Sequence, residues 1–261
     1  MPSELCTAIA ANGGAVKTIE HLMASLVGCE VDNAYLEVSG EEIPVMDGSS
    51  GAFVRLIRAA GVVSQGCHQP YLKIVKPVEV RNGKRSVVIK PSPYPRVTYT
   101  IEYAHPLIQR QTYDFTWSPD AFEREIADAR TFGFLHEVES LWARGLAKGG
   151  SLDNTVVLSD RDVLNQTGLR YRDEFVRHKV LDLIGDMALL GTPVIGHVVA
   201  DCSGHAMHTK LAERILKETD CWVLLGHDEP AYATQTDWRP KTFPELSPPV
   251  SPVMLPAAAG Y

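Results

Sequence analysis

The amino-acid sequence predicts an α+β fold made of two similar units, and two observations support this prediction. Apolar residues recur at helical spacing over residues 18–28 and 174–190, which is typical of amphipathic helices packed on a core. Residues 71–117 instead contain successive strand-like segments. The two units share an order of strands and then helices, as expected of a duplicated α+β domain.

The first unit spans residues 1–66 and contains the helix over 18–28. Alternating apolar residues predict a half-buried strand over 33–39, and a second helix is expected after a cap at Ser49 or Ser50. Four side chains of this second helix are expected to face the core: Phe53, Leu56, Ile57 and Ala60.

The second unit spans residues 67–229 and follows a polar linker. The sequence RNGK at 81–84 is a strong hairpin signal, and Ser118 followed by proline marks a helix start. The other elements are expected as strands over 71–80, 86–90, 97–103, 111–117, 155–158 and 194–200 and as helices over 174–190 and 205–218. Residues 230–261 are rich in proline, so we expect a flexible tail there.

Composition and charge exclude several classes of protein. The net charge of -7 and the pI of about 5.7 argue against a general nucleic-acid binder, so no nucleic-acid partner is expected. The cysteines are scattered without a CxxC pair, which excludes a thiolate metal knuckle and suits a reducing cytosol. The start of the chain has no signal-peptide pattern and acidic residues interrupt the most apolar stretch, so we expect a cytoplasmic protein.

His178 and Asp182 are candidate metal ligands on the long helix. Residues i and i+4 lie on the same helix face, and an imidazole with a carboxylate suits zinc. The alternative is a surface ion pair, the commoner fate of an isolated HxxxD pattern. Apolar neighbours, with Asp186 one turn further and Lys179 alongside, favour a buried site, because buried charges need partners.

Glu20 and His21 form a second candidate pair. His21 would supply a third protein ligand, and three ligands with an open position are typical of catalytic zinc. The adjacent Glu20 carboxylate could then accept a proton from water. The alternative is a solvated helix face, because both residues lie outside the apolar stripe of their helix.

His205 follows Ser203 and Gly204 at the start of a predicted helix. A histidine on such a turn points into a cleft, where its imidazolium could protonate a leaving amine or stabilise an oxyanion. The alternative is an ordinary polar residue of intermediate burial.

Several long motifs, taken in order, resemble a single family. They are LCT (5–7), TIEHLMASLVGCEVDNAYLEV (18–38), EIPVMDGSSGAFV (42–54), ARTFGFLHEVE (129–139), RGLAKGGSLDNTVVL (144–158), EFVRHKVLDLIGDMALLG (174–191) and SGHAMHTKL (203–211). In these segments the chain is similar to the zinc-dependent UDP-3-O-acyl-N-acetylglucosamine deacetylases of lipid A biosynthesis. This resemblance implies two similar two-layer α/β sandwich domains of the ribosomal protein S5 domain 2-like type, with the metal site between them.

The resemblance also implies a set of site residues. One Zn²⁺ per chain, for which Fe²⁺ can substitute, would be bound by His21, His178 and Asp182. Glu20 would be the general base and His205 the general acid. Asp186 would orient His205, and Thr131 would help polarise the amide carbonyl. Lys179 would contact the diphosphate, and Phe132 would border the acyl-chain passage.

The implied reaction removes the N-acetyl group of UDP-3-O-(3-hydroxyacyl)-N-acetylglucosamine, giving the free amine and acetate in the committed step of lipid A biosynthesis. The expected partner is this UDP-sugar lipid, with transient contact to a membrane surface, and the expected state is a monomer. Family members carry several tens of residues before the LCT segment, so the first domain is expected to be truncated at its N-terminus, with an exposed sheet edge.

Two alternatives to an active deacetylase stay open. The chain could be an inactive or partner-dependent fragment of that enzyme. Two histidines and a carboxylate also form the metal site of non-haem Fe(II) oxygenases, although the usual short HxD arrangement is missing here.

Overall fold

The computed structural model describes residues 6–138 and 149–226, and the statements below concern these two ranges. The tail predicted over 230–261 lies outside them. Within them the chain forms helices and several separate β-sheets, so the predicted α+β class is confirmed.

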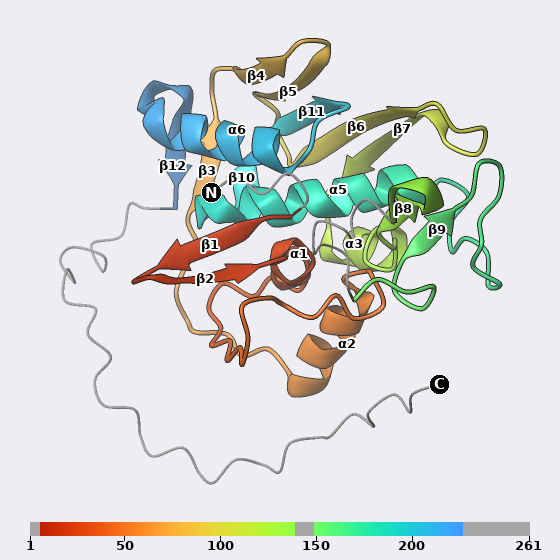
Figure 1. Ribbon diagram of the computed structural model, residues 1–261. Helices are drawn as coiled ribbons and strands as arrows, with labels where there is room; N and C mark the ends of the chain where they lie inside the picture. Colours follow the sequence, from red (N-terminus) through yellow and green to blue (C-terminus); the bar gives the residue numbers. More distant parts are fainter. Residues whose placement is uncertain (1–5, 139–148, 227–261) are drawn as a thin grey trace, which may run out of the picture. The chain divides into compact units, whose positions relative to one another are not determined.

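Helix α5 (Glu174–Met187) runs through the middle of the fold (Figure 1). Helix α1 (Glu20–Gly28) packs along one side of it, and α6 (His205–Lys217) packs along the other. All three helices lie where the sequence predicts helices. Because side chains from α1 and α6 both reach α5, the central helix can join groups that are far apart in the sequence.

The largest sheet has five strands, and its order places the chain's late strand between early ones. In spatial order it contains β4 (Val78–Asn82), β5 (Arg85–Lys90), β11 (His197–Asp201), β6 (Arg96–Tyr103) and β7 (Gln109–Thr116). Strand β11 is antiparallel to β5 and parallel to β6. The predicted hairpin is confirmed, because Asn82 pairs with Arg85 across a turn in which Gly83 has a φ of 59°.

Three smaller sheets complete the strand inventory of the described residues. They are β1 (Ala8–Ala11) with β2 (Gly14–Lys17), β10 (Val194–Ile195) with β3 (Tyr71–Ile74) and β12 (Trp222–Leu225), and β8 (Phe132–Phe134) with β9 (Val156–Leu158). Helix α3 (Pro119–Glu125) begins as predicted, since the Ser118 hydroxyl accepts a hydrogen bond from the Ala121 amide.

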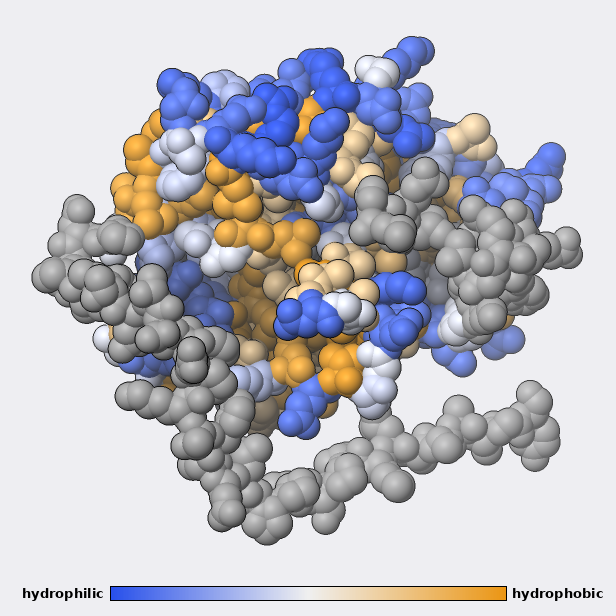
Figure 2. All heavy atoms as spheres, turned by 60° about the vertical axis from the view of Figure 1, so that its left-hand side comes forward, coloured by the Kyte–Doolittle hydropathy of each residue, from blue (hydrophilic) through white to orange (hydrophobic). Residues whose placement is uncertain are grey.

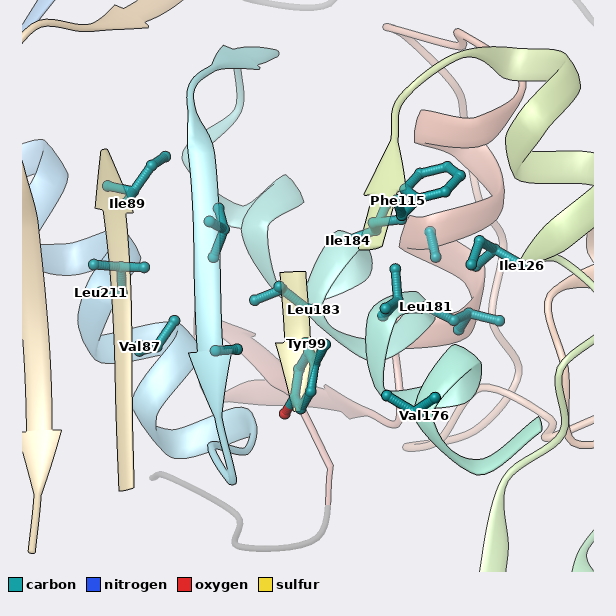
Figure 3. Close-up of a cluster of buried hydrophobic side chains, with 14 of the residues drawn as sticks. Val87, Ile89, Tyr99, Phe115, Ile126, Val176, Leu181, Leu183, Ile184 and Leu211 are labelled. Atoms are coloured by element: carbon teal, nitrogen blue, oxygen red, sulfur yellow. The ribbon is translucent and has the colours of Figure 1, made fainter. Parts of the chain in front are cut away.

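One continuous core joins the five-stranded sheet to the helices (Figure 3). Val87 and Ile89 of β5 lie at one end with Leu211 of α6, and Phe115 of β7 lies at the other. Leu181 and Leu183 of α5 lie between these groups and are fully buried. The polar face of α5 is therefore held in place by a well-packed apolar face.

Two predicted strands prove to be broken. The strand expected over 71–80 is β3 and β4 separated by residues 75–77, and the strand expected over 194–200 is β10 and β11 separated by Gly196. In both cases the two halves belong to different sheets. A Cβ at Gly196 would lie 3.0 Å from the side chains of Ile74 and Ile89, so a glycine allows the chain to cross closely between the sheets.

Two predictions for the first unit are wrong. Residues 33–39 form no strand, because no described strand pairs with them, and most of the segment is exposed. Helix α2 (Gly51–Ala60) exists, but Leu56 is 58% exposed and Ala60 is also exposed. The helix lies at the periphery and packs on α1, so it buries only a narrow face containing Phe53 and Val54.

A cap for α2 was predicted at Ser49 or Ser50. The Ser49 hydroxyl accepts a hydrogen bond from the amide of Gly51, the first residue of the helix, at 3.2 Å. Ser50 is the residue before the helix, but its hydroxyl makes no capping bond and instead donates to the His21 carbonyl oxygen at 2.7 Å. This bond ties α2 to α1 beside the candidate site.

Residues 1–226 cluster as one unit of contacts, and the predicted boundary at residue 66 stays a prediction.

The side of the molecule that carries β1, β2 and β12 exposes apolar side chains, including Ile9 and Val223 (Figure 2). Among the described residues, the helices are too short or too polar to cross a lipid bilayer.

Candidate metal and proton-transfer site

One face of α5 carries three polar side chains at successive helical turns. His178, Asp182 and Asp186 are each no more than 2% exposed, although most of this helix is buried among apolar residues. The spacing of four residues places them in a row on a single face. A row of buried polar groups requires partners from the neighbouring helices.

Helix α1 provides two of these partners through a close approach to α5. Glu20 and His21 are 3% and 5% exposed, so the alternative of a solvated helix face is wrong. The approach depends on Gly185 of α5, where a Cβ would lie only 2.0 Å from the Glu20 carbonyl oxygen. Any larger residue at this position would push the two helices apart.

Two imidazoles converge on one carboxylate oxygen. His178 Nε2 lies 3.3 Å from Asp182 Oδ1, and His21 Nε2 lies 3.6 Å from the same oxygen. The two rings meet edge to face, with their centroids 5.0 Å apart. Donor atoms of a four-coordinate zinc ion lie about 3.3 Å apart, because each is roughly 2 Å from the metal. These separations fit a shared metal ion.

The hydrogen bonds of His178 identify the atom that faces Asp182. Its Nδ1 lies 3.0 Å from the Ala129 carbonyl oxygen, which can only accept, so Nδ1 carries the proton and Nε2 carries a lone pair. Burial lowers the pKa of His178 to about 3, so the ring is neutral. Burial alone would raise the pKa of Asp182, but the Lys179 ammonium, which donates to Asp182 Oδ2 at 2.8 Å, lowers it and keeps the carboxylate ionised.

The result is a neutral nitrogen lone pair that faces an ionised carboxylate oxygen. Two acceptors at 3.3 Å repel each other unless a cation lies between them. The residues present therefore fit a divalent metal ion, with His21, His178 and Asp182 as ligands. The surface ion pair that the HxxxD spacing also allowed does not describe this buried pair.

A second group of two histidines and a carboxylate lies further along α5. Asp186 Oδ2 lies 2.8 Å from His205 Nδ1 and 2.7 Å from His208 Nδ1. These distances are those of hydrogen bonds from two N–H groups to one carboxylate oxygen, and they are too short for two ligands of one metal ion. The hydroxyl of Thr7 donates to the other oxygen, Asp186 Oδ1.

The two groups are joined by His205 and Thr7. His205 Nε2 points back to the first group and lies 3.8 Å from Asp182 Oδ2. The Thr7 amide donates to Glu20 Oε2 at 2.9 Å, so one residue contacts both Glu20 and Asp186. A carboxylate, a pair of imidazoles and a third histidine thus lie close together in the buried interior, which is an arrangement suited to hydrolysis.

Comparison with known proteins identifies the family that has this site. The family model for UDP-3-O-acyl N-acetylglycosamine deacetylase matches residues 1–217. The UDP-3-O-acyl-N-acetylglucosamine deacetylase of Geotalea uraniireducens is 44% identical over 245 residues, which are 94% of this chain and 79% of the relative. The enzyme of the same name from Syntrophotalea carbinolica is 47% identical over 88% of this chain and 74% of its own length. The chain belongs to the UDP-3-O-acyl-N-acetylglucosamine deacetylase family.

Family membership confirms the resemblance drawn from the motifs. It supports a deacetylase over a non-haem Fe(II) oxygenase or an inactive fragment, the two alternatives left open by the residues alone. The roles of the individual site residues stay predictions.

Two further predicted residues, Lys179 and Phe132, lie beside the site, and a third, Thr131, lies on a neighbouring segment. Lys179 donates to Asp182 Oδ2 at 2.8 Å, and its Nζ lies 5.6 Å from the centre of the Phe132 ring. Thr131 lies two residues after Ala129, whose carbonyl orients His178, and is half-buried. The structure thus places Lys179 and Phe132 together and places Thr131 on the segment that contacts His178, a candidate metal ligand.

A buried ion pair holds that segment against α5. Glu174, in the first turn of α5, accepts from both the backbone amide and the side chain of Arg130, each at 2.9 Å. Arg130 and Glu174 are 4% and 0% exposed. Because this pair anchors the residue after Ala129, it fixes the carbonyl that orients His178. No role was predicted for either residue from the sequence.

His208 and Thr7 were also not predicted. The spacing of three residues between His205 and His208 was a usable signal, since i and i+3 share a helix face. Thr7 had no comparable signal, because its partner Asp186 is 179 residues away.

Proposed function

We propose that this chain is a zinc-dependent deacetylase that hydrolyses the N-acetyl group of UDP-3-O-(3-hydroxyacyl)-N-acetylglucosamine, the committed step of lipid A biosynthesis. The observation that supports this most directly is the neutral lone pair of His178 facing ionised Asp182, within reach of His21. The relatives named above carry the name of this reaction.

Zinc is the proposed cofactor, one ion per chain, and Fe²⁺ is a substitute with similar ligand preferences. When bound by His21, His178 and Asp182, the ion would supply Lewis acidity, which lowers the pKa of water and polarises a carbonyl. The other steps depend on the protein's own side chains.

Glu20 is the proposed general base. Burial raises the pKa of its carboxyl, which makes the carboxylate a better proton acceptor than an exposed glutamate. Its Oε2 is held by the Thr7 amide, so the carboxylate is oriented before substrate binds. Glu20 would take the proton of the attacking water as the new C–O bond forms to the acetyl carbon.

His205 is the proposed general acid. Burial would lower its pKa, but the Asp186 carboxylate raises it to about 9, so the ring is protonated near pH 7. Asp186 accepts from Nδ1, which leaves the Nε2 proton free for the sugar nitrogen. As the C–N bond breaks, that proton passes to the nitrogen, and acetate and the free amine leave.

The remaining residues are proposed to bind substrate. Thr131 would polarise the amide carbonyl, Lys179 would contact the diphosphate, and Phe132 would border the acyl-chain passage. A cavity of about 370 Å³ lies next to Phe132, whose ring is 5.6 Å from that of the cavity-lining Tyr103. Its lining also includes His105, so it offers aromatic and imidazole groups to a planar base of the substrate.

The proposed architecture is two similar two-layer α/β sandwich domains, over residues 1–66 and 67–229, with the metal site between them. The contact between α1 and α5 agrees with this, because each helix would come from a different domain. We further propose a cytoplasmic monomer that touches the membrane surface transiently when it takes up its lipid substrate and that has no nucleic-acid partner.

The test is Glu20→Gln, assayed for acetate release and for bound metal. The amide cannot accept a proton, so kcat should fall by about 10²- to 10⁴-fold while zinc stays at one per chain. The matched control is Glu213→Gln on the exposed side of α6, which should keep full activity. Undiminished turnover in Glu20→Gln would refute the base assignment, and iron with oxygen consumption in the native protein would refute the zinc proposal.

A further inference from the structure

The oxygen that orients His205 is shared with a second histidine. His208 Nδ1 lies 2.7 Å from Asp186 Oδ2, slightly closer than His205 Nδ1 at 2.8 Å. His208 is fully buried, so its ring does not contact bulk water. The proposed reaction uses His205 and Asp186 but gives His208 no part.

The other side of the His208 ring is also bonded. The Ser203 hydroxyl lies 2.8 Å from His208 Nε2, and the Tyr99 hydroxyl lies 3.3 Å from it. Tyr99 donates to the Ser203 carbonyl oxygen at 2.8 Å, and the Ser203 hydroxyl in turn donates to the Tyr99 hydroxyl at 3.2 Å. His208 is thus held at both nitrogens, with its Nδ1 proton directed at Asp186.

Both carboxylate oxygens of Asp186 are held by hydrogen bonds. The Thr7 hydroxyl occupies Oδ1, and the His208 N–H occupies one lone pair of Oδ2. A carboxylate fixed at both ends cannot rotate, and the remaining lone pair of Oδ2 then faces His205 Nδ1.

We propose that His208 is a positioning residue of the deacetylase, which holds the Asp186 carboxylate in the orientation that aligns the His205 ring. This inference rests on the proposed role of His205 as the proton donor. The His208 ring bonds Asp186 on one side and Ser203 on the other, so it would act through Asp186.

The experiment compares two substitutions at one position. His208→Leu removes both hydrogen bonds, whereas His208→Asn retains an N–H that can reach Asp186. Loss of an outer partner of this kind lowers activity by about 10- to 100-fold, so kcat of His208→Leu should fall by that factor. KM should change by less than about twofold, because the residue does not bind substrate. Asparagine should restore kcat to within about threefold of the native protein.

A control variant separates positioning from packing. His197→Gln removes the bond of a histidine to Thr98 on the five-stranded sheet and should leave kcat near the native value. If His208→Leu does not fold, the smaller His208→Ala takes its place, and an unchanged kcat in that variant would overturn the inference.

The kinetics of these variants distinguish a wrong role for His208 from a wrong deacetylase assignment. Equal losses in His208→Leu and His208→Asn, or a loss carried by KM, would mean that His208 is structural only. Native activity that disappears in Glu20→Gln but is unchanged in His208→Leu would overturn this inference and leave the deacetylase assignment intact.

Discussion

The two histidine–aspartate groups on α5 contain the same functional groups but differ in where their protons lie. In the first, imidazole nitrogens lie 3.3 and 3.6 Å from Asp182, and in the second they lie 2.8 and 2.7 Å from Asp186. Both groups are buried. The comparison shows that side-chain composition alone does not distinguish a metal site from a hydrogen-bonded one.

The cause of the difference is the position of a backbone carbonyl. The Ala129 oxygen takes the Nδ1 proton of His178, so a lone pair faces Asp182. No such carbonyl competes at His205, whose Nδ1 proton bonds Asp186 directly among the described residues. A carbonyl on a loop therefore determines whether a carboxylate faces a lone pair or a proton.

The largest expected effect comes from deleting a ligand of the first group. His178→Ala should reduce bound zinc from one per chain to almost none and abolish deacetylation, because two remaining ligands hold the ion weakly. The measurement is metal content together with acetate release. His208→Leu, the matched change in the second group, should keep its zinc; zinc loss from that variant would erase the distinction between the groups.

A smaller effect is expected from widening the gap between α1 and α5. Gly185→Ala places a methyl carbon only 2.0 Å from the Glu20 carbonyl oxygen, so α1 must move and carry His21 away from Asp182. We expect a loss of about 1–3 kcal/mol in unfolding free energy and weaker zinc binding, measured by denaturation and metal titration. Gly40→Ala, where a Cβ meets nothing within 4 Å, is the control. Unchanged zinc affinity would show that His21 is not a ligand.

The smallest expected effect is confined to the second group. Thr7→Val removes the donor to Asp186 Oδ1 but keeps the backbone amide that holds Glu20. We expect kcat to fall about tenfold, equivalent to about 1.4 kcal/mol, with zinc content unchanged. Thr112→Val on the five-stranded sheet is the isosteric control. A change in zinc content would contradict the separation of the two groups.

Short-range patterns predicted the helices well and the first unit's strand poorly. The bounds of α5 and the hairpin at Gly83 depend on local spacing and on one turn residue, which neighbours in sequence specify. The strand expected over 33–39 and the buried face expected to include Leu56 depend instead on what packs against them. Alternation of apolar residues cannot supply a missing pairing partner.

The sequence by itself determined which candidate groups share a helix face, because a 3.6-residue period places His178, Asp182 and Asp186 in one row whatever surrounds them. Only the tertiary structure decided that the first carboxylate faces a lone pair of His178 and the second faces the N–H groups of His205 and His208. That decision depends on Ala129, 49 residues from His178, and on Thr7, 179 residues from Asp186. Periodicity within one helix contains no information about such distant hydrogen-bond partners.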